Sequence, residues 1–166
     1  MKIGKMADVS LKLFLLLFLV GAVAAGCSSA PRYRSYPSGD EDLGRQILDS
    51  AESQMGVDYH YGGTSPDTGF DCSGLAWWSH SVNGIDIPRE SDSQYYSKKG
   101  KKISKSNLMP GDLVYFETYR KGPSHVGIYT GKGSFVHSPN SNKSVQEDEM
   151  TNSYYKKRYL GARRFW

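Results

Sequence analysis

The chain has 166 residues, a formal net charge of +4 at pH 7, and only two cysteines, Cys27 and Cys72. This length fits one domain with an appendage, and twelve tyrosines and three tryptophans give that domain enough apolar surface for a compact core. The absence of HExxH, CxxC and GxSxG motifs argues against zinc and serine hydrolases, and the short basic clusters are typical of a solvated surface rather than a nucleic-acid interface.

Residues 1–26 have the pattern of a secretory leader. A basic start precedes an apolar stretch that is shorter than the about 20 residues needed to span a bilayer. The run VAAGCSSA resembles a bacterial lipobox, although Ala24 stands where leucine is usual. Because Ser28 is not acidic, the resemblance implies a Cys27 carrying acyl chains such as palmitate, anchored to the outer membrane and facing the periplasm. The alternative is cleavage after Ala24, which leaves Cys27 as a free thiol.

The rest of the chain divides into a tether and one domain. Residues 27–40 are rich in Ser, Pro, Gly and Arg and lack apolar periodicity, which predicts a flexible tether before a domain over residues 41–166. Apolar spacing predicts helices over residues 40–56, where Gly56 is the stop, and over residues 72–84. A short third helix is predicted within residues 88–100.

The periodicity changes after residue 112. Short β-rich runs separated by Gly, Pro and Asn cover residues 113–118, 125–131, 134–138 and 159–166. Helices first and antiparallel strands afterwards predict an α+β domain, with the helices packed on one side of the sheet.

Cys72 is the first candidate for chemistry. The run GFDCSG places it at the first turn of a predicted helix, where free backbone N–H groups and the helix dipole favour a thiolate, so we expect its pKa to be lowered. A buried structural cysteine is the alternative, but the glycines and polar residues around it argue against an apolar site. If Cys27 is acylated, Cys72 has no intramolecular partner, which points to a nucleophile. Asp71, just before it, is a helix N-cap, a substrate contact, or both.

A cysteine nucleophile needs an imidazole, and the run HVGIYTGKGSFVH predicts a hairpin with a histidine at each end. If the strands pair symmetrically about Gly131, His125 and His137 lie directly opposite, with Cβ atoms about 5 Å apart. One imidazole then faces the thiol while the other orients it. A chance pair of histidines remains the alternative. His60 and His80 are expected to have local or surface roles.

Five segments together resemble the NlpC-type bacterial cell-wall cysteine peptidases. In chain order they are YHYGGTSPDTGFDCSG, IPRESDSQ, PGDLVYF, HVGIYTGKGSFVH and GARRF, within a match from Gly44 to Phe165. The resemblance is greatest to small lipoproteins of Gram-negative bacteria. It implies a papain-like α+β fold that cleaves peptide stems of peptidoglycan, commonly at bonds involving D-amino acids or diaminopimelate.

The same resemblance implies residue roles. Cys72 matches the nucleophile, His125 the general base, and His137 the third, orienting residue. Tyr59 matches a tyrosine whose hydroxyl lies beside the active site. The positions that shape substrate binding are matched by Asp71 and Ser73.

The resulting hypothesis is a monomeric cysteine endopeptidase without metal or cofactor, whose partners are peptidoglycan stems and a lipid anchor, with no nucleic acid. Two alternatives stay open. One is another acyl-transfer enzyme with a Cys–His pair, such as an amidase or transpeptidase. The other is a non-catalytic wall-binding lipoprotein, against which the intact set of Cys72, His125 and His137 argues.

Overall fold

The computed structural model describes residues 39–140 and 142–166 of the chain. The predicted leader, the predicted lipidation site Cys27 and the predicted tether up to residue 38 lie outside these described residues. Within the described part, no helix has both the length and the apolar character needed to cross a membrane.

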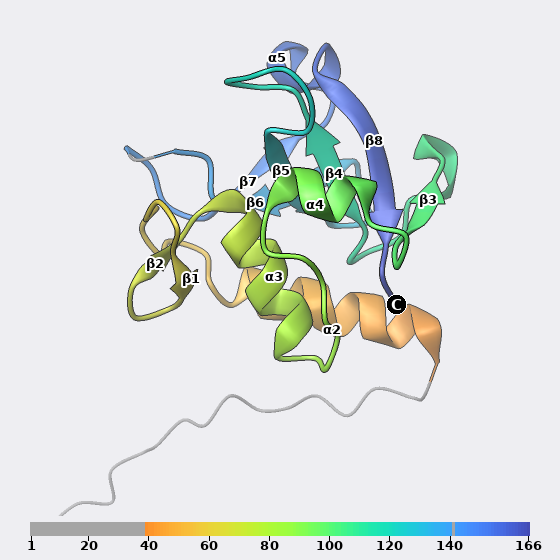
Figure 1. The fold of residues 1–166 in the computed structure, drawn as a ribbon, viewed down its shortest axis with the longest axis horizontal. Coiled ribbons are helices and arrows are strands. Elements are labelled where there is room, and N and C mark those ends of the chain that lie inside the picture. Colours follow the sequence, from red (N-terminus) through yellow and green to blue (C-terminus); the bar gives the residue numbers. More distant parts are fainter. Residues whose placement is uncertain (1–38, 141) are drawn as a thin grey trace, which may run out of the picture. The chain divides into compact units, whose positions relative to one another are not determined.

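The three predicted helices are present, each with shorter bounds than predicted. The helices are α2 (Asp40–Glu52), α3 (Cys72–Ser81), α4 (Ser91–Tyr96) and α5 (Ser153–Lys156), with a 3₁₀ turn at Lys105–Asn107 (Figure 1). Helix α2 stops before the predicted end because residues 53–56 turn away from its axis, and Gly56, at φ 86°, closes that turn. Helix α5 was not predicted, since four residues are too few to show a helical period.

A six-stranded sheet forms the other layer, with strand order β3-β8-β4-β5-β6-β7 and antiparallel pairing throughout. Its strands are β3 (Lys101–Ile103), β4 (Leu113–Phe116), β5 (His125–Tyr129), β6 (Ser134–His137), β7 (Gln146–Glu149) and β8 (Tyr159–Arg164). A small second sheet pairs β1 (Thr64–Ser65) with β2 (Gly69–Phe70). The predicted α+β class, with helices on an antiparallel sheet, is confirmed.

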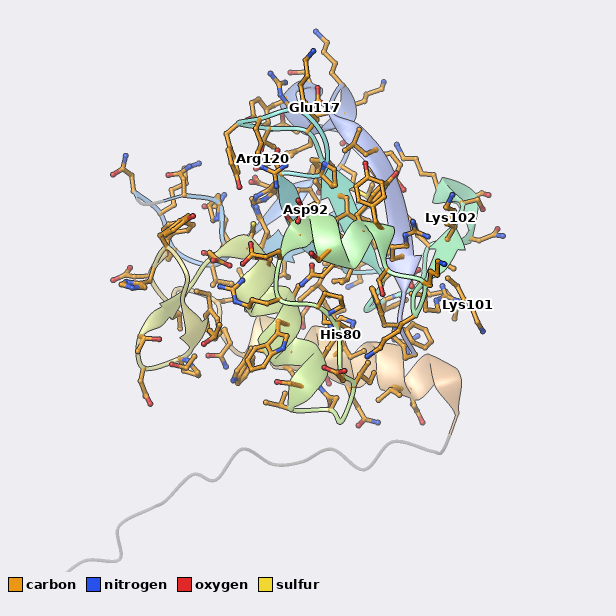
Figure 2. All side chains as sticks on the ribbon, in the orientation of Figure 1. His80, Asp92, Lys101, Lys102, Glu117 and Arg120 are labelled. Atoms are coloured by element: carbon orange, nitrogen blue, oxygen red, sulfur yellow. The ribbon has the colours of Figure 1, made fainter. Side chains whose placement is uncertain are left out.

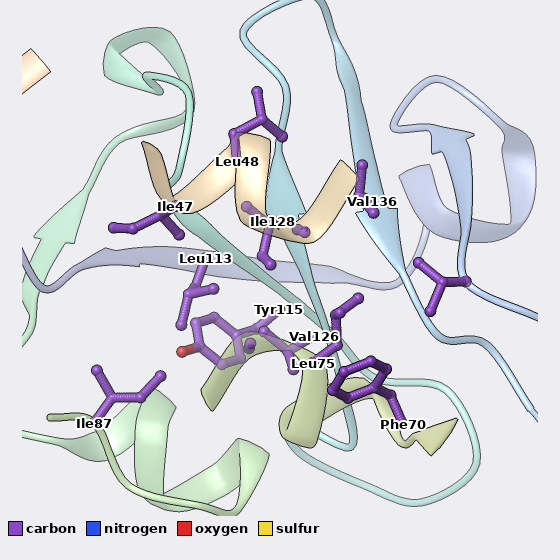
Figure 3. Packing of buried hydrophobic residues seen from close by; sticks show 13 residues of the cluster. Ile47, Leu48, Phe70, Leu75, Ile87, Leu113, Tyr115, Val126, Ile128 and Val136 are labelled. Atoms are coloured by element: carbon purple, nitrogen blue, oxygen red, sulfur yellow. The ribbon is translucent and has the colours of Figure 1, made fainter. Parts of the chain in front are cut away.

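Helices α2 and α3 cover one face of the large sheet, and strand alternation divides the core accordingly (Figure 3). Leu113 and Tyr115 of β4 pack into the cluster beneath these helices, whereas Val114 and Phe116 point to the opposite face. The helix-side cluster is completed by Ile47, Leu48, Leu75, Val126, Ile128 and Val136, among others. The opposite cluster contains Val114, Phe116, Phe135, Met150, Tyr155 and Ala162. Both faces of the central strands are therefore buried.

Candidate active site

Cys72 is the first residue of α3 and is half-buried against the helix-side cluster. Asp71 is the N-cap of this helix, with extended backbone (φ −88°, ψ 175°), and its Oδ1 accepts a hydrogen bond from the Gly74 N–H at 2.6 Å. The N-cap interpretation of Asp71 is thus confirmed. The cap fixes where the helix begins, and so fixes the place of the thiol one residue later.

The Asp71 carboxylate is held by an arginine that sequence reasoning left without a role. Arg89 donates from Nη1 to Oδ1 at 3.0 Å and from Nη2 to Oδ2 at 2.7 Å, a two-pronged ion pair. The Gly62 N–H donates to Oδ2 at 2.9 Å, and the buried Ser73 hydroxyl donates to Oδ1 at 3.2 Å. Asp71 therefore joins the loop before β1, the start of α3 and Arg89 into one rigid unit. Substrate contact by Asp71 and Ser73 stays a prediction.

The expected lowering of the Cys72 pKa is wrong for this structure. Burial, followed by the negative charge of Asp71, raises the pKa of the thiol to about 11, although backbone N–H groups of Val126 and Ser73 directed at the sulfur oppose the rise. The sequence argument considered only the helix dipole and the free N–H groups at the start of α3, which favour a thiolate. It did not consider the Asp71 carboxylate at the same helix end, whose negative charge opposes a thiolate.

The predicted pairing about Gly131 is also wrong. Strand β5 pairs with β6 through Ile128–Val136 and Tyr129–Phe135, and the Thr130 N–H donates to the Ser134 carbonyl at 3.0 Å. The turn is therefore centred on Lys132, and continuing the register places His137 across from Gly127 rather than from His125.

The two histidines meet nonetheless, because they are diagonal neighbours on the same face of the sheet. His125 Nε2 lies 2.7 Å from His137 Nδ1, and the ring centroids are 5.0 Å apart. The residue between them on that face, Gly127, has no side chain to intervene; a Cβ there would lie 2.3 Å from the Phe135 ring.

An acidic residue extends this pair into a chain of three side chains. His137 Nε2 lies 2.9 Å from Asp148 Oδ2, and the same oxygen accepts from Gln146 Nε2 at 3.0 Å. Because a carboxylate only accepts, His137 carries its proton on Nε2, and its Nδ1 accepts from the Nε2–H of His125. His125 Nδ1 is then unprotonated, which is the form that a general base requires.

Burial keeps this imidazole pair neutral. His125 is 4 % exposed and His137 is 0 % exposed. Burial, followed by the neighbouring His137, lowers the pKa of His125 to about 3, against an opposing contribution from Asp148. Burial also lowers the pKa of His137, while its hydrogen bond to Asp148 raises it. The hydrogen bond from His137 in turn lowers the pKa of Asp148. The carboxylate therefore stays charged while both rings stay neutral at rest.

Tyr155 of α5 packs against the hydrogen-bonded side chains of His125 and His137. Its ring lies edge-on to His137 with centroids 5.6 Å apart, and stacks beside His125 at 6.4 Å. Its hydroxyl hydrogen-bonds Asp148, which together with burial raises the pKa of Tyr155. Sequence reasoning missed Asp148 and Tyr155. No signal in the run QEDE distinguishes Asp148 from its acidic neighbours before the sheet register is known.

Two tyrosines interact electrostatically with the thiol. Burial, followed by the charge on Cys72, raises the pKa of both Tyr59 and Tyr119, so both hydroxyls lie within electrostatic reach of the sulfur. The role that the resemblance implies for Tyr59, with its hydroxyl beside the active site, stays a prediction, and Tyr119 was not predicted. Tyr61, 85 % exposed, is a further neighbour of both tyrosines.

The loop that carries Tyr119 is fastened to α4. Arg120 forms an ion pair with Asp92 at 3.5 Å, where the two side chains approach each other in Figure 2. The Ser91 hydroxyl donates to the Pro123 carbonyl at 2.7 Å. These contacts hold the loop between β4 and β5 over the start of the strand that carries His125.

The remaining histidines lie outside this arrangement. His80 is fully buried within α3, its Nδ1 is 2.8 Å from the Ala76 carbonyl, and burial lowers its pKa to about 4. Its predicted local role is confirmed, and His60 is exposed. Over residues 39–140 and 142–166, no group of three or more His, Cys, Asp or Glu side chains is placed to hold a metal ion.

Comparison with known proteins identifies the family. The model of the NlpC/P60 family matches residues 56–164. The chain belongs to the NlpC/P60 family. This span includes Tyr59, Cys72, both catalytic histidine candidates and Asp148, so the matched region contains the whole candidate site.

Two relatives of this NlpC/P60 chain are named as endopeptidases of murein or peptidoglycan. It is 41% identical over 113 residues to "Murein DD-endopeptidase MepH" of Escherichia coli K12, covering 67% of this chain and 42% of that protein. It is 41% identical over 120 residues to "Probable peptidoglycan endopeptidase LytE" of Bacillus subtilis, covering 72% and 34%. The chain thus spans about two fifths or less of the length of these curated relatives.

Solved structures agree on the fold. An NlpC/P60 family protein from Bacillus cereus superposes with a TM-score of 0.68 at 34% identity, covering 78% of this chain and 41% of that one. The NlpC/P60 domain of the peptidoglycan hydrolase SagA gives a TM-score of 0.62 at 31% identity, covering 73% and 97%. The SagA domain is covered almost completely, so the described part corresponds to one whole NlpC/P60 domain.

Proposed function

We propose that this protein is a cysteine endopeptidase that hydrolyses peptide stems or cross-links of peptidoglycan during cell-wall remodelling. The observation that carries the proposal is the hydrogen-bonded chain His125–His137–Asp148, together with a cysteine at the start of α3 whose thiol is hydrogen-bonded by the backbone of Val126, the residue after His125. The names of the relatives support the same substrate class.

The geometry suggests how the reaction proceeds. Since the resting thiol and imidazole are both neutral, the Cys72 proton passes to His125 Nδ1 as the sulfur attacks the amide carbon. The positive charge that develops on the imidazoles is stabilised by Asp148. His125 then gives its proton to the departing amine. A water deprotonated by the same nitrogen releases the acyl group from Cys72. Backbone N–H groups that already point at the sulfur, from Ser73 and Val126, are suitable donors for the oxyanion.

The test is digestion of defined muropeptides by the full chain purified in detergent. We expect each cleavage to release one new amino group and one new carboxyl group, and mass spectrometry of the products identifies the bond. An amidase that cuts between sugar and peptide also releases one amino and one carboxyl group, but its products are the sugar with a free lactyl carboxylate and the whole stem peptide. A transpeptidase conserves the number of amide bonds. A protein that binds these stems without any turnover would refute the proposal.

We further propose that acyl chains on Cys27 anchor the protein to the outer membrane, with the domain facing the periplasm. The lipobox-like run VAAGCSSA and the non-acidic Ser28 support this. Each buried methylene contributes about 0.8 kcal/mol, so several acyl chains far outweigh any charge-based attraction of the domain.

Substitution of the lipidation site tests the anchor. We expect Cys27→Ser to convert the protein from one that stays with membranes in high salt to one that washes off, measured by membrane fractionation. Cys72→Ser, with the same chemical change at the other cysteine, is the control and should stay on the membrane. Retention of Cys27→Ser in high salt would instead locate the anchor in an uncleaved leader.

A further inference from the structure

A cavity of about 490 Å³ opens beside the imidazole pair and has no role in the site described so far. Its walls come from the loop between β4 and β5, the loop between β6 and β7, and the region of α5. The lining residues are Thr118, Tyr119, His125, Pro139, Asn140, Lys143, Asp148, Asn152, Tyr154 and Tyr155.

The cavity is on the side of the base, not of the nucleophile. His125 and Asp148 line it, whereas Cys72 and Asp71, both within the described residues, do not. In acyl transfer the sulfur keeps the acyl half of the substrate, and the histidine protonates the half that leaves as an amine. A cavity that is lined by the histidine and not by the cysteine is therefore placed to hold the leaving half.

The lining contains one cation that is available to a ligand. Lys143 is exposed and forms no ion pair with any carboxylate in residues 39–140 and 142–166. Its charge nevertheless lies close enough to the imidazole pair to lower the pKa of His137. This effect is smaller than the lowering by burial and the raising by Asp148. The ammonium is thus within electrostatic reach of the place where the amine departs.

The acidic residue in the lining already has hydrogen-bond donors. Asp148 accepts hydrogen bonds from His137 and Gln146 and from the Tyr155 hydroxyl. A second cation, the Arg158 guanidinium, lies 3.9 Å from the ring centroid of the lining Tyr154. The polar groups left to meet a ligand therefore favour an anion.

We propose that this cavity binds the leaving half of the substrate, and that Lys143 pairs there with a carboxylate on the carbon that bears the scissile nitrogen. The proposal rests on the proposed endopeptidase function. In a cross-link through diaminopimelate, that carbon carries a free carboxylate. In the bond between D-glutamate and diaminopimelate inside one stem, the carboxyl group on the carbon that bears the scissile nitrogen is tied up as the amide to the following D-alanine. Lys143 thus selects the cross-link over the bond between D-glutamate and diaminopimelate.

Two matched substrates test the selection by hydrolysis. Both have a D-alanyl group on one amino group of diaminopimelate, and the adjacent carboxyl is free in one and a primary amide in the other. Loss of a charge-assisted pair predicts that the full-length protein cleaves the free acid about tenfold or more faster in kcat/KM. Lys143→Met should bring this ratio close to one, and Lys143→Arg should preserve it. Lys102→Met is the matched control and should keep the wild-type ratio. Lys102 lies on β3, and Figure 2 shows it well away from Glu117 and Arg120, the two residues that flank the lining residues Thr118 and Tyr119.

A binding measurement separates this proposal from the proposed function. Free diaminopimelate and its monoamide are titrated into the full chain and into Lys143→Met, with dissociation constants read from NMR shifts. Preference for the free acid that depends on Lys143, in a protein without hydrolytic activity, would support the cavity assignment and reject the endopeptidase. Hydrolysis of both substrates at a ratio that Lys143→Met leaves unchanged would overturn the cavity assignment alone. Absence of any acid preference in both measurements overturns it as well.

Discussion

Cys72→Ser should lower kcat/KM for muropeptide hydrolysis by roughly 10⁴-fold or more, because a hydroxyl is far less acidic than a thiol and is a much weaker nucleophile. The effect should be severe in this site, since burial and Asp71 already raise the pKa of the thiol to about 11. A serine hydroxyl in the same place is still harder to deprotonate, and His125, whose pKa is lowered to about 3, is a weak acceptor for its proton.

The fold should be unaffected by this change. The side chain at position 72 is half-buried, and oxygen replaces sulfur with little change in volume, so the free energy of unfolding should move by less than about 1 kcal/mol. Release of amino groups measures activity, and a thermal melt measures stability. Ser73→Ala is a useful comparison, because it removes a neighbouring hydroxyl without touching the sulfur. Activity of Cys72→Ser near that of the wild type would remove Cys72 from the nucleophile role.

The elements that position the thiol were predictable because their signals are local. An aspartate directly before a helical apolar period predicts an N-cap, and Asp71 is one. Strands β4, β5 and β6 are rich in β-branched and aromatic residues, which is why they stand out. Strands β3 and β7 read KKI and QEDE and carry no such signal. They form because they hydrogen-bond to neighbours that the sequence does not identify.

The hydrogen-bonded chain of His125, His137 and Asp148 also depends on contacts that the sequence does not identify. That His125 and His137 share a face follows from strand alternation and was predicted. Their register was not, because Gly131 and Gly133 both have φ 88° and either glycine can take the left-handed position of a turn; the structure centres the turn on Lys132 between them rather than on Gly131. Asp148 becomes visible only when β7 is paired with β6. The two histidines could thus be predicted from the hairpin sequence, whereas Asp148 joins them only through the pairing of β7 with β6.

The electrostatics of the nucleophile required the whole structure. A helix N-terminus alone lowers a thiol pKa, yet here the sum of burial, Asp71, Arg89 and two backbone donors is a raised pKa. In the proposed mechanism, the pair of Cys72 and His125 therefore depends on transfer of a proton during attack rather than on a preformed thiolate. The histidines must accept that proton, so substitutions in the chain His125–His137–Asp148 should lower activity more than any others except those of Cys72.

His125 and His137 should for that reason be unequal. His125→Asn removes the nitrogen that takes the thiol proton and returns it to the amine, and loss of a general base typically costs 10²–10⁴-fold in kcat. His137→Gln replaces a ring that only accepts from His125 and donates to Asp148. A glutamine amide has one oxygen to accept and one NH₂ to donate, so it can keep His125 in the tautomer whose Nδ1 is free.

We therefore expect His137→Gln to retain measurable activity, clearly more than His125→Asn. The matched control is His137→Leu, which fills the buried site beside Phe135 and Tyr155 but can neither accept nor donate. It should fall well below His137→Gln if the role of residue 137 is to fix the tautomer of His125. Thermal melts of all three variants separate this from loss of packing. If His137→Gln and His137→Leu are equally impaired, residue 137 acts through its own charge, and if His125→Asn is the most active of the three, the base is His137. If His137 were the base, the thiol proton would have to reach a nitrogen of His137. Both nitrogens of that ring are already hydrogen-bonded, Nδ1 to His125 and Nε2 to Asp148, whereas Nδ1 of His125 is left free.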